Sequence, residues 1–210
     1  MCIFRASIGL KEDTKYLKNA TECDLPYGAY HYVKAGTAED ARKEAEYFVQ
    51  CANKAAPLFY IADIEENAQN EKTTEPVCVA FLETLQKLGC KKIGLYINNH
   101  YKWAGKAIEM SDIIWIPHWG KNDGKIPEEK YAPEYPCDIW QYTSVGRVSG
   151  INEDVDLNIL RDGHSLDWFT AATAPADPMD SFYTITIKHI PEKEMSVLRG
   201  QWPECEVTKE

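Results

Sequence analysis

The 210-residue sequence has no excess of basic residues and no long apolar run. Asp and Glu number 33 against 23 Lys and Arg, which gives a formal net charge of −10. Proteins that bind nucleic acids diffusely are basic, so that class is disfavoured. No window approaches the ~18 apolar residues of a membrane span, and we expect no membrane insertion. With 44% hydrophobic residues the chain can form a core, as one domain or one domain with an appendage.

The sequence also lacks the motifs of common metal and cofactor sites. There is no CxxC, HxH, HExxH or acid-rich calcium loop, so we expect no metal. There is no GxSxG elbow, Walker loop or GxGxxG after the first strand, and we expect no cofactor. The seven cysteines are an odd number in apolar surroundings, typical of reduced thiols in a protein made in the cytosol. The first five residues do not resemble a signal peptide, so we expect cytoplasmic synthesis without one.

Short apolar runs alternate with helical stretches in the first half of the chain. Apolar residues recur at helical spacing over residues 38–55, after Thr37, which suits an N-cap. A second helix is expected from near Thr74, with Pro76 in its first turn, to Gly89. Such alternation predicts an α/β fold with a parallel sheet, open or closed into a barrel. The candidate strands are residues 2–7, 28–33, 58–63, 93–97, 112–117, 138–142 and 154–157.

The second half of the chain has a different character. From residue 112 to residue 157 the strands are joined by loops, the longest of which covers residues 118–136. Residues 171–180 are rich in Ala and Pro and are typical of a linker. We therefore expect a main domain over 1–170 and a short α+β tail over 181–210. Because so short a tail buries little core alone, it is expected to dock on the main domain, to form a homodimer, or to begin a further module.

The sharpest local feature is an apolar strand that ends in acids, at residues 58–66. Asp63 and Glu65 are two residues apart, so their side chains point to the same face. The carboxyl ends of parallel strands are where sites form in α/β folds. Two carboxylates there suit glycoside hydrolysis, in which one protonates the leaving oxygen and the other stabilises the cation or orients a reacting group. A solvated acidic cap is the alternative, and the spacing does not decide between retention and inversion.

Other candidate site residues lie at or near further strand ends. Asp156 lies in a second acidic strand end at residues 154–158, for which a simple turn is the alternative. Aromatic faces beside carboxylates suit a sugar ring, which needs apolar stacking and hydrogen bonds. For the aromatic residues of the 138–142 strand, core packing is the alternative. The candidate substrate-binding residues are Tyr30, Tyr96, Trp115, Trp119, Trp140, Gln141 and Tyr142.

Seven segments spanning about residues 1–160 carry a combined pattern. They are Phe4-Arg5-Ala6, Gly28-Ala29-Tyr30-His31-Tyr32, Asp63-Ile64-Glu65, Gly94-Leu95-Tyr96, Trp115-Ile116, Trp140-Gln141-Tyr142 and Val155-Asp156-Leu157-Asn158. Taken together, these segments resemble the family 25 glycoside hydrolases, the Ch-type lysozymes that include bacterial autolysins and phage endolysins. The resemblance implies a TIM-like β/α barrel with fewer helices in its second half. It also implies cleavage of the β-1,4 bond between N-acetylmuramic acid and N-acetylglucosamine in peptidoglycan.

The resemblance also implies roles for individual residues. Glu65 would be the general acid/base, Asp63 would assist by orienting the substrate's own N-acetyl group, and Asp156 would line the floor of the site. The partner would be the bacterial cell wall. A phage endolysin would reach that wall through lysis or a holin-type route, and the tail could begin a wall-binding module.

The chain departs from the family at its N-terminus. The family's barrel begins with a strand carrying an Asp-x-Ser-like motif, whose Asp belongs to the active site. This chain starts at what resembles the second strand, and no Asp precedes Asp13. We therefore expect the first barrel strand to be missing. A catalytically impaired glycan-binding or interaction protein derived from this fold remains the alternative to an active muramidase.

Overall fold

The computed structural model describes residues 1–66, 69–161 and 163–170. The chain divides into two units, Met1–Thr173 and Ala174–Glu210, and the described residues belong to the first. The predicted linker at 171–180 and tail at 181–210 lie outside the described residues, so their roles stay predictions. In the part of the chain that is described, no helix combines the length and the apolar character needed to cross a bilayer.

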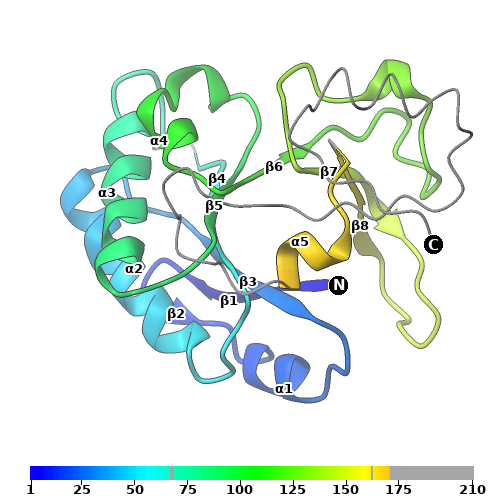
Figure 1. The fold of residues 1–210 in the computed structure, drawn as a ribbon, viewed down its shortest axis with the longest axis horizontal. Coiled ribbons are helices and arrows are strands. Elements are labelled where there is room, and N and C mark those ends of the chain that lie inside the picture. Colours follow the sequence, from blue (N-terminus) through cyan, green and yellow to red (C-terminus); the bar gives the residue numbers. More distant parts are fainter. Residues whose placement is uncertain (67–68, 162, 171–210) are drawn as a thin grey trace, which may run out of the picture. The chain divides into compact units, whose positions relative to one another are not determined.

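One eight-stranded sheet, in the order β2-β1-β3-β4-β5-β6-β7-β8, is the scaffold of the molecule (Figure 1). Strands β1 and β3 to β7 run parallel to one another, whereas β2 and β8 are antiparallel to their neighbours. The strands are β1 (Cys2–Ile8), β2 (Lys11–Glu12), β3 (Tyr27–Tyr32), β4 (Tyr60–Ile64), β5 (Ile93–Ile97), β6 (Ile113–Pro117), β7 (Ile139–Gly146) and β8 (Val155–Leu160).

The sheet curls into a half-barrel, and within the described sheet β8 does not pair with β1. This confirms the predicted α/β barrel-like architecture, and the open edge is consistent with a missing first strand. All seven expected strands are present. The short β2, which the sequence analysis did not predict, pairs with the end of β1 through Ser7 and Glu12.

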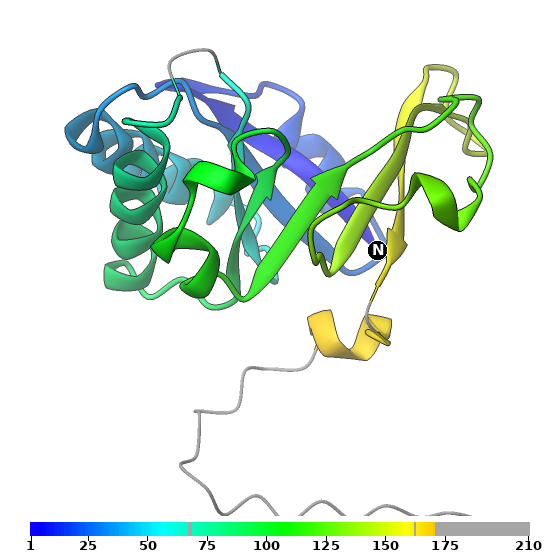
Figure 2. The same ribbon diagram turned by 90° about the horizontal axis from the view of Figure 1, so that it is seen from above.

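Helices cover one face of the first half of the sheet. The two predicted helices are present as α2 (Ala38–Ala52) and α3 (Thr74–Lys87), and the Thr37 side chain caps α2 by accepting the Asp40 N–H at 3.2 Å. Figure 2 shows these helices beside the first strands, whereas β7 and β8 at the other end of the sheet have no such cover. The prediction of fewer helices in the second half is thus confirmed. The remaining helices are α1 (Tyr16–Thr21), η1 (Tyr101–Trp103), α4 (Lys106–Glu109), η2 (Glu129–Tyr131) and α5 (Leu166–Thr170).

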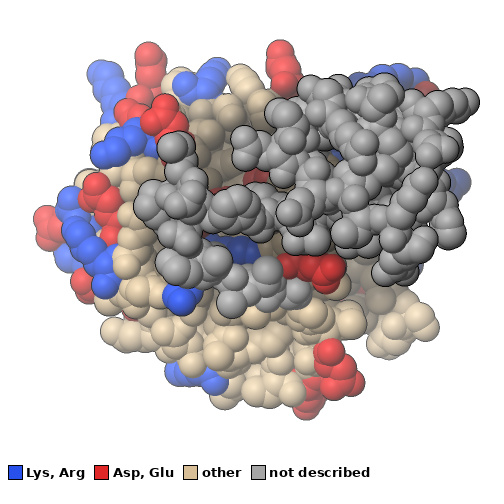
Figure 3. Space-filling view, viewed as in Figure 1, with Lys and Arg blue, Asp and Glu red and all other residues tan. Residues whose placement is uncertain are grey.

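Charged side chains on the helical side are interspersed rather than segregated by sign (Figure 3). On α2, the Lys43 ammonium group lies 2.8 Å from the Glu39 carboxylate. Lys54, just after α2, lies 2.7 Å from Glu12 of β2. Such exposed pairs contribute at most about 1 kcal/mol each, so the core rather than the surface holds the fold together.

Two hydrophobic clusters pack on opposite faces of the sheet. The outer cluster, between sheet and helices, contains Phe48 of α2 and Phe81 of α3. The inner cluster lies on the concave face, where Phe169 of α5 packs on Phe59 with ring centroids 5.7 Å apart. Because strand side chains alternate between faces, Ile61 belongs to the inner cluster while its neighbours on β4 belong to the outer one. The same alternation directs Asp63 to the concave face.

A buried polar network connects β1, β3 and α2 on the outer face. Ser7 Oγ lies 2.7 Å from His31 Nδ1, and Glu44 Oε2 lies 3.0 Å from His31 Nε2. Glu44 also accepts the backbone N–H of Lys34 at 2.9 Å. Burial lowers the pKa of His31, although Glu44 opposes the shift. A neutral ring that donates from Nε2 to Glu44 and accepts the Ser7 hydroxyl proton at Nδ1 satisfies this network.

Candidate active site

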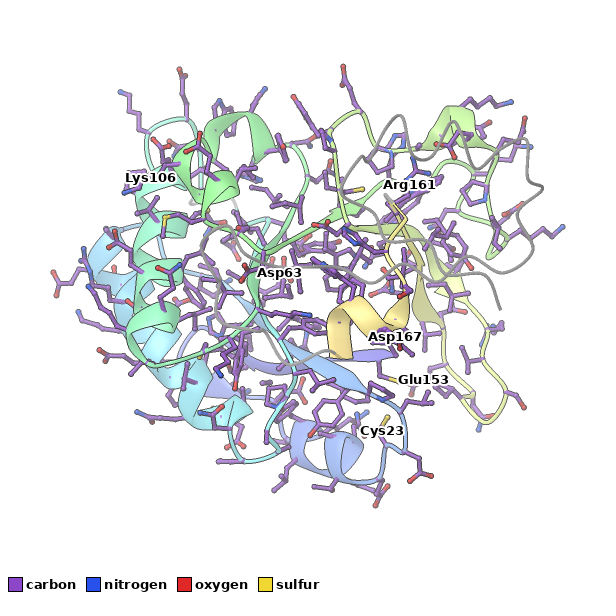
Figure 4. The ribbon with its side chains drawn as sticks, viewed as in Figure 1. Cys23, Asp63, Lys106, Glu153, Arg161 and Asp167 are labelled. Atoms are coloured by element: carbon purple, nitrogen blue, oxygen red, sulfur yellow. The ribbon has the colours of Figure 1, made fainter. Side chains whose placement is uncertain are left out.

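A hollow of about 150 Å³ lies on the concave face, at the carboxyl ends of the parallel strands. Figure 4 shows Asp63 in the middle of the sheet, near the end of β4. The hollow contains seven of the predicted site residues, which come from strands far apart in the sequence. Its lining residues are Arg5, Tyr30, Tyr32, Asp63, Glu65, Tyr96, Trp115, Gln141 and Asp156.

The three predicted carboxylates come to this hollow from two parts of the sheet, the end of β4 and the start of β8. Asp63 is on β4 and Glu65 follows directly after it, so the spacing of two residues places both on the concave side. Asp156 lies at the start of β8, not at the strand end that the sequence analysis expected. Because β8 returns antiparallel to β7, its first residues lie beside the carboxyl ends of the parallel strands.

Asp63 is the most buried acid of the hollow, with 5% of its surface exposed. Its Oδ1 atom has no hydrogen-bond partner among the described residues. Burial, followed by the neighbouring charge of Glu65, raises the pKa of Asp63 from 3.8 to about 8, while the Arg5 guanidinium opposes the shift. Asp63 therefore holds a proton at neutral pH.

Glu65 and Asp156 are more exposed to solvent than Asp63. Partial burial raises the pKa of Glu65, and the charges of Asp156 and Glu66 add to the shift. Partial burial also raises the pKa of Asp156. Ionisation of one of these acids therefore makes ionisation of its neighbours less favourable, and the pKa values of such coupled carboxyl groups belong to the group as a whole. Such a set can supply a proton donor and a carboxylate in the same site.

Arg5 of β1 lines the hollow, and the sequence analysis did not identify it as a site residue. Its Nε donates to Asp13 Oδ2 at 2.9 Å. Asp13 follows β2, which pairs along the open edge of β1. The β1–β2 turn therefore brings an acid and a cation to this edge of the described sheet. A lone cation in the apolar strand 2–7 was the signal that could have pointed to Arg5.

Aromatic side chains form a wall around Gln141. Tyr96 and Trp115 contact each other edge to face, with centroids 4.6 Å apart. The Tyr96 hydroxyl and the Trp119 indole N–H both donate to Gln141 Oε1, at 3.2 and 2.9 Å. The Trp115 indole N–H donates to Asn158 Oδ1 at 2.8 Å. These bonds fix the orientation of the rings before any ligand arrives.

The structure does not bring Trp140 and Tyr142 to the hollow, which corrects the expectation that they bind substrate there. Both are buried in the outer cluster, and the Trp140 indole N–H donates to the His118 carbonyl oxygen at 2.7 Å. They flank Gln141 on β7, so strand alternation turns them to the other face. Trp119 lies outside the lining but contacts it through Gln141, and Tyr32 lines the hollow although it was not predicted as a substrate-binding residue.

A curled sheet with acids and aromatic rings at the carboxyl ends of its parallel strands defines a class, the glycoside hydrolases of α/β-barrel type. Among the described residues, no group of three or more His, Cys, Asp or Glu side chains is arranged to hold a metal ion. Within that class the chain belongs to glycosyl hydrolases family 25, whose sequence model matches residues 10–151.

Individual relatives agree with this assignment. Lysozyme M1 of Streptomyces globisporus is 24% identical over 164 residues, which cover 67% of this chain and 51% of the relative. The chain thus spans about half the length of this curated relative.

Two solved structures share the fold. One is GHIP of Streptococcus pneumoniae, a glycosyl hydrolase 25 described as a virulence factor participating in host cell invasion. It superposes with a TM-score of 0.71 at 24% identity, and the match covers 80% of this chain and 79% of the GHIP chain. The catalytic domain of endolysin ply40, from bacteriophage P40 of Listeria monocytogenes, has a TM-score of 0.66 at 27% identity, with coverages of 80% and 83%.

Proposed function

We propose that this protein is a peptidoglycan hydrolase, an N-acetylmuramidase that cleaves the β-1,4 bond between N-acetylmuramic acid and N-acetylglucosamine. The observation that carries the proposal is the meeting of Asp63, Glu65 and Asp156 in one hollow of a family 25 half-barrel. The names of the lysozyme and endolysin relatives support the same activity. An enzyme of this kind acts on the cell wall. Its synthesis in the cytoplasm and release by lysis or a holin-type route remain predictions.

In this proposal Glu65 is the general acid/base and Asp63 the assisting group. Asp63 holds the proton in the free site, because burial raises its pKa to about 8. The N–H of the substrate's N-acetyl group would donate to Asp63 and so stabilise its carboxylate. The proton would then be available to Glu65, which is exposed in the hollow. Substrate binding would thus load the acid that the reaction needs.

The chemical step then follows from these positions. Glu65 gives its proton to the leaving oxygen as the bond to the anomeric carbon breaks. The N-acetyl oxygen, oriented by Asp63, stabilises the positive charge that develops on that carbon. Glu65, now a carboxylate, takes a proton from the water that completes hydrolysis. Tyr96 and Trp115 would stack on the sugar, with Asp156 facing the same space.

A second candidate function is a glycan-binding protein with impaired catalysis. The observation that favours it is the open edge of the described sheet, where β2 rather than a further parallel strand pairs with β1. Such a protein would keep the aromatic wall and bind peptidoglycan without producing new reducing ends.

The experiment is a peptidoglycan turbidity assay of the purified full chain, with analysis of reducing ends, for the parent and Glu65→Gln. We expect the parent to lyse walls and the variant to lose activity while its unfolding temperature is unchanged, because the amide matches the acid in size but donates no proton to the leaving oxygen. Glu46→Gln on the exposed side of α2 is the matched control.

The possible results separate the two candidates. If the parent binds cell walls but releases no reducing ends, the protein is a glycan-binding protein and not a muramidase. If Glu65→Gln lyses walls as fast as the parent, the acid assignment is wrong.

A further inference from the structure

A second hollow, of about 120 Å³, lies in the loop between β6 and β7 and is not used by the mechanism above. Trp119, Ile126 and Tyr131 give it apolar walls, and Lys121 and Lys125 add two ammonium groups. The Ile126 side chain is 74% exposed and that of Trp119 41%. Apolar side chains gathered at this exposure in one depression are typical of a binding surface rather than a core.

The loop that forms this hollow is anchored to the sheet. Asn122 Oδ1 accepts hydrogen bonds from Thr143 Oγ1 at 2.8 Å and from the Ser144 N–H at 2.9 Å. His118 Nδ1 lies 2.5 Å from the carbonyl oxygen of Tyr131, which connects the start of the loop with η2 inside it. The hollow is therefore preformed, and a ligand would not have to order the loop on binding.

Trp119 connects the second hollow with the first. It lines the second hollow, and its indole N–H donates at 2.9 Å to Gln141, which lines the first. A ligand that occupies the first hollow and carries a branch can therefore continue along Trp119 without leaving the surface.

The lining of the second hollow carries two ammonium groups, those of Lys121 and Lys125, and two carboxylates, those of Asp123 and Glu128. Asp123 accepts the backbone N–H of Lys125 at 3.2 Å, and Glu128 pairs with Lys130 at 2.9 Å. In contrast, neither Lys121 nor Lys125 forms an ion pair with a carboxylate of the described residues. The lining holds as many acids as bases, but these two ammonium groups have no carboxylate partner among the described residues and can pair with a ligand. They match carboxylate groups on a ligand.

We propose that the second hollow binds the stem peptide of peptidoglycan, the short carboxylate-bearing peptide carried by muramic acid. This inference rests on the proposed function, because the glycan in the first hollow brings the peptide alongside. A further neutral sugar would use Trp119 but would leave the two ammonium groups without a partner. An anionic peptide uses both the apolar walls and the lysines.

The test compares the parent with the double variant K121E/K125E on two substrates, intact peptidoglycan and the same glycan freed of its peptides by an amidase. Each exposed charge contact is worth up to about 1 kcal/mol, so the loss of both should lower kcat/KM on the intact wall by up to roughly 30-fold. On the peptide-free glycan we expect no change. Added salt should lower kcat/KM of the parent on the intact wall and have little effect on the variant.

K87E/K91E is the matched control, with the same change in net charge. Both lysines are exposed, Lys87 at the end of α3 and Lys91 before the amino end of β5, whereas the loop of the hollow follows the carboxyl end of β6. The inference is wrong if K121E/K125E loses activity equally on both substrates, if it loses none on the intact wall, or if the control loses as much.

A binding measurement separates this inference from the proposed function. A soluble pentapeptide with a blocked amine, N-acetyl-L-Ala–D-Glu–L-Lys–D-Ala–D-Ala, carries two carboxylates against one ammonium group. It is titrated into Glu65→Gln while Trp fluorescence is recorded, so that no cleavage is required. Binding that K121E/K125E abolishes supports the peptide site even if the parent cleaves nothing. The peptide site is refuted if the peptide does not bind while a peptide-free oligosaccharide binds and K121E/K125E weakens that binding. The proposed glycan site stands in that case.

Discussion

Asp63→Asn is expected to stabilise the protein while removing activity. The Asp63 carboxyl is buried, and its pKa rises from 3.8 in its ordinary state to about 8 in the fold. Between these two values the folded chain holds a proton that the unfolded chain has released. The stability contributed by this group therefore falls as the pH rises from about 4 to about 8. An amide has the same size and no ionisation to suppress, so the variant escapes this loss.

The magnitude follows from the two pKa values. At about 1.36 kcal/mol for each unit of pH, the penalty is about 2 kcal/mol at pH 5, about 4 kcal/mol at pH 7 and about 5 kcal/mol at pH 8. The unsatisfied Oδ1 is common to the protonated acid and the amide, so its cost largely cancels in the comparison. A gain of about 4 kcal/mol corresponds to roughly 10 °C in unfolding temperature for a domain of this size.

The assay is urea-induced unfolding of parent and variant at pH 5, 7 and 8, followed by Trp fluorescence. The difference in the free energy of unfolding should grow with pH in favour of Asp63→Asn, and Glu46→Gln should show no such trend. A difference that is the same at pH 5 and pH 8 would refute the buried, protonated Asp63 on which the mechanism depends.

Three further predictions follow from the described contacts. The rate of lysis should be highest at mildly acidic to neutral pH and should fall above about pH 8, where Asp63 loses the shared proton; a rate that rises steadily to pH 9 would contradict this pair. His31→Ala should lower the free energy of unfolding by about 3–5 kcal/mol in urea titrations, because it leaves a cavity beside Phe48 and Phe81 and removes the ring partner of the buried Glu44 carboxylate; a loss below about 1 kcal/mol would show that the network is not structural. Deleting residues 171–210 should leave solubility, unfolding temperature and a monomeric state unchanged if the tail begins a separate module; a lost dimer or a lower unfolding temperature would show that it pairs with a second chain or packs on the barrel.

The sequence predicted the elements that have a long or strongly periodic pattern. Helices α2 and α3 run for three or more turns, so their apolar spacing is unambiguous. Helices α1, α4 and α5 have four to six residues, too few for a period to show, and they were not predicted. The two-residue β2 exists only through its pairing with β1, which is a tertiary contact.

For the candidate site, local spacing succeeded where the contact is local. The pair Asp63 and Glu65 follows from strand alternation alone, and the hollow contains both. The same alternation, applied to β7, separates Gln141 from Trp140 and Tyr142, which the sequence analysis grouped together. The direction of β8 and the partner of Arg5 depend on how distant segments pair, and one sequence does not contain that information.

The open edge of the half-barrel has a consequence for how the chain folds. In a closed barrel the first and last strands must meet, and the whole intervening chain forms one loop whose closure costs entropy. Here every strand pairs with the strand next to it in sequence, except that β3 joins β1 across the β2 turn and α1. The longest separation among the paired positions is that between β4 and β5, such as Tyr60 with Ile93. Each parallel pairing is still non-local, because a helix or a long loop separates the two strands along the chain, so we expect the sheet to form slowly but without a late ring-closing step.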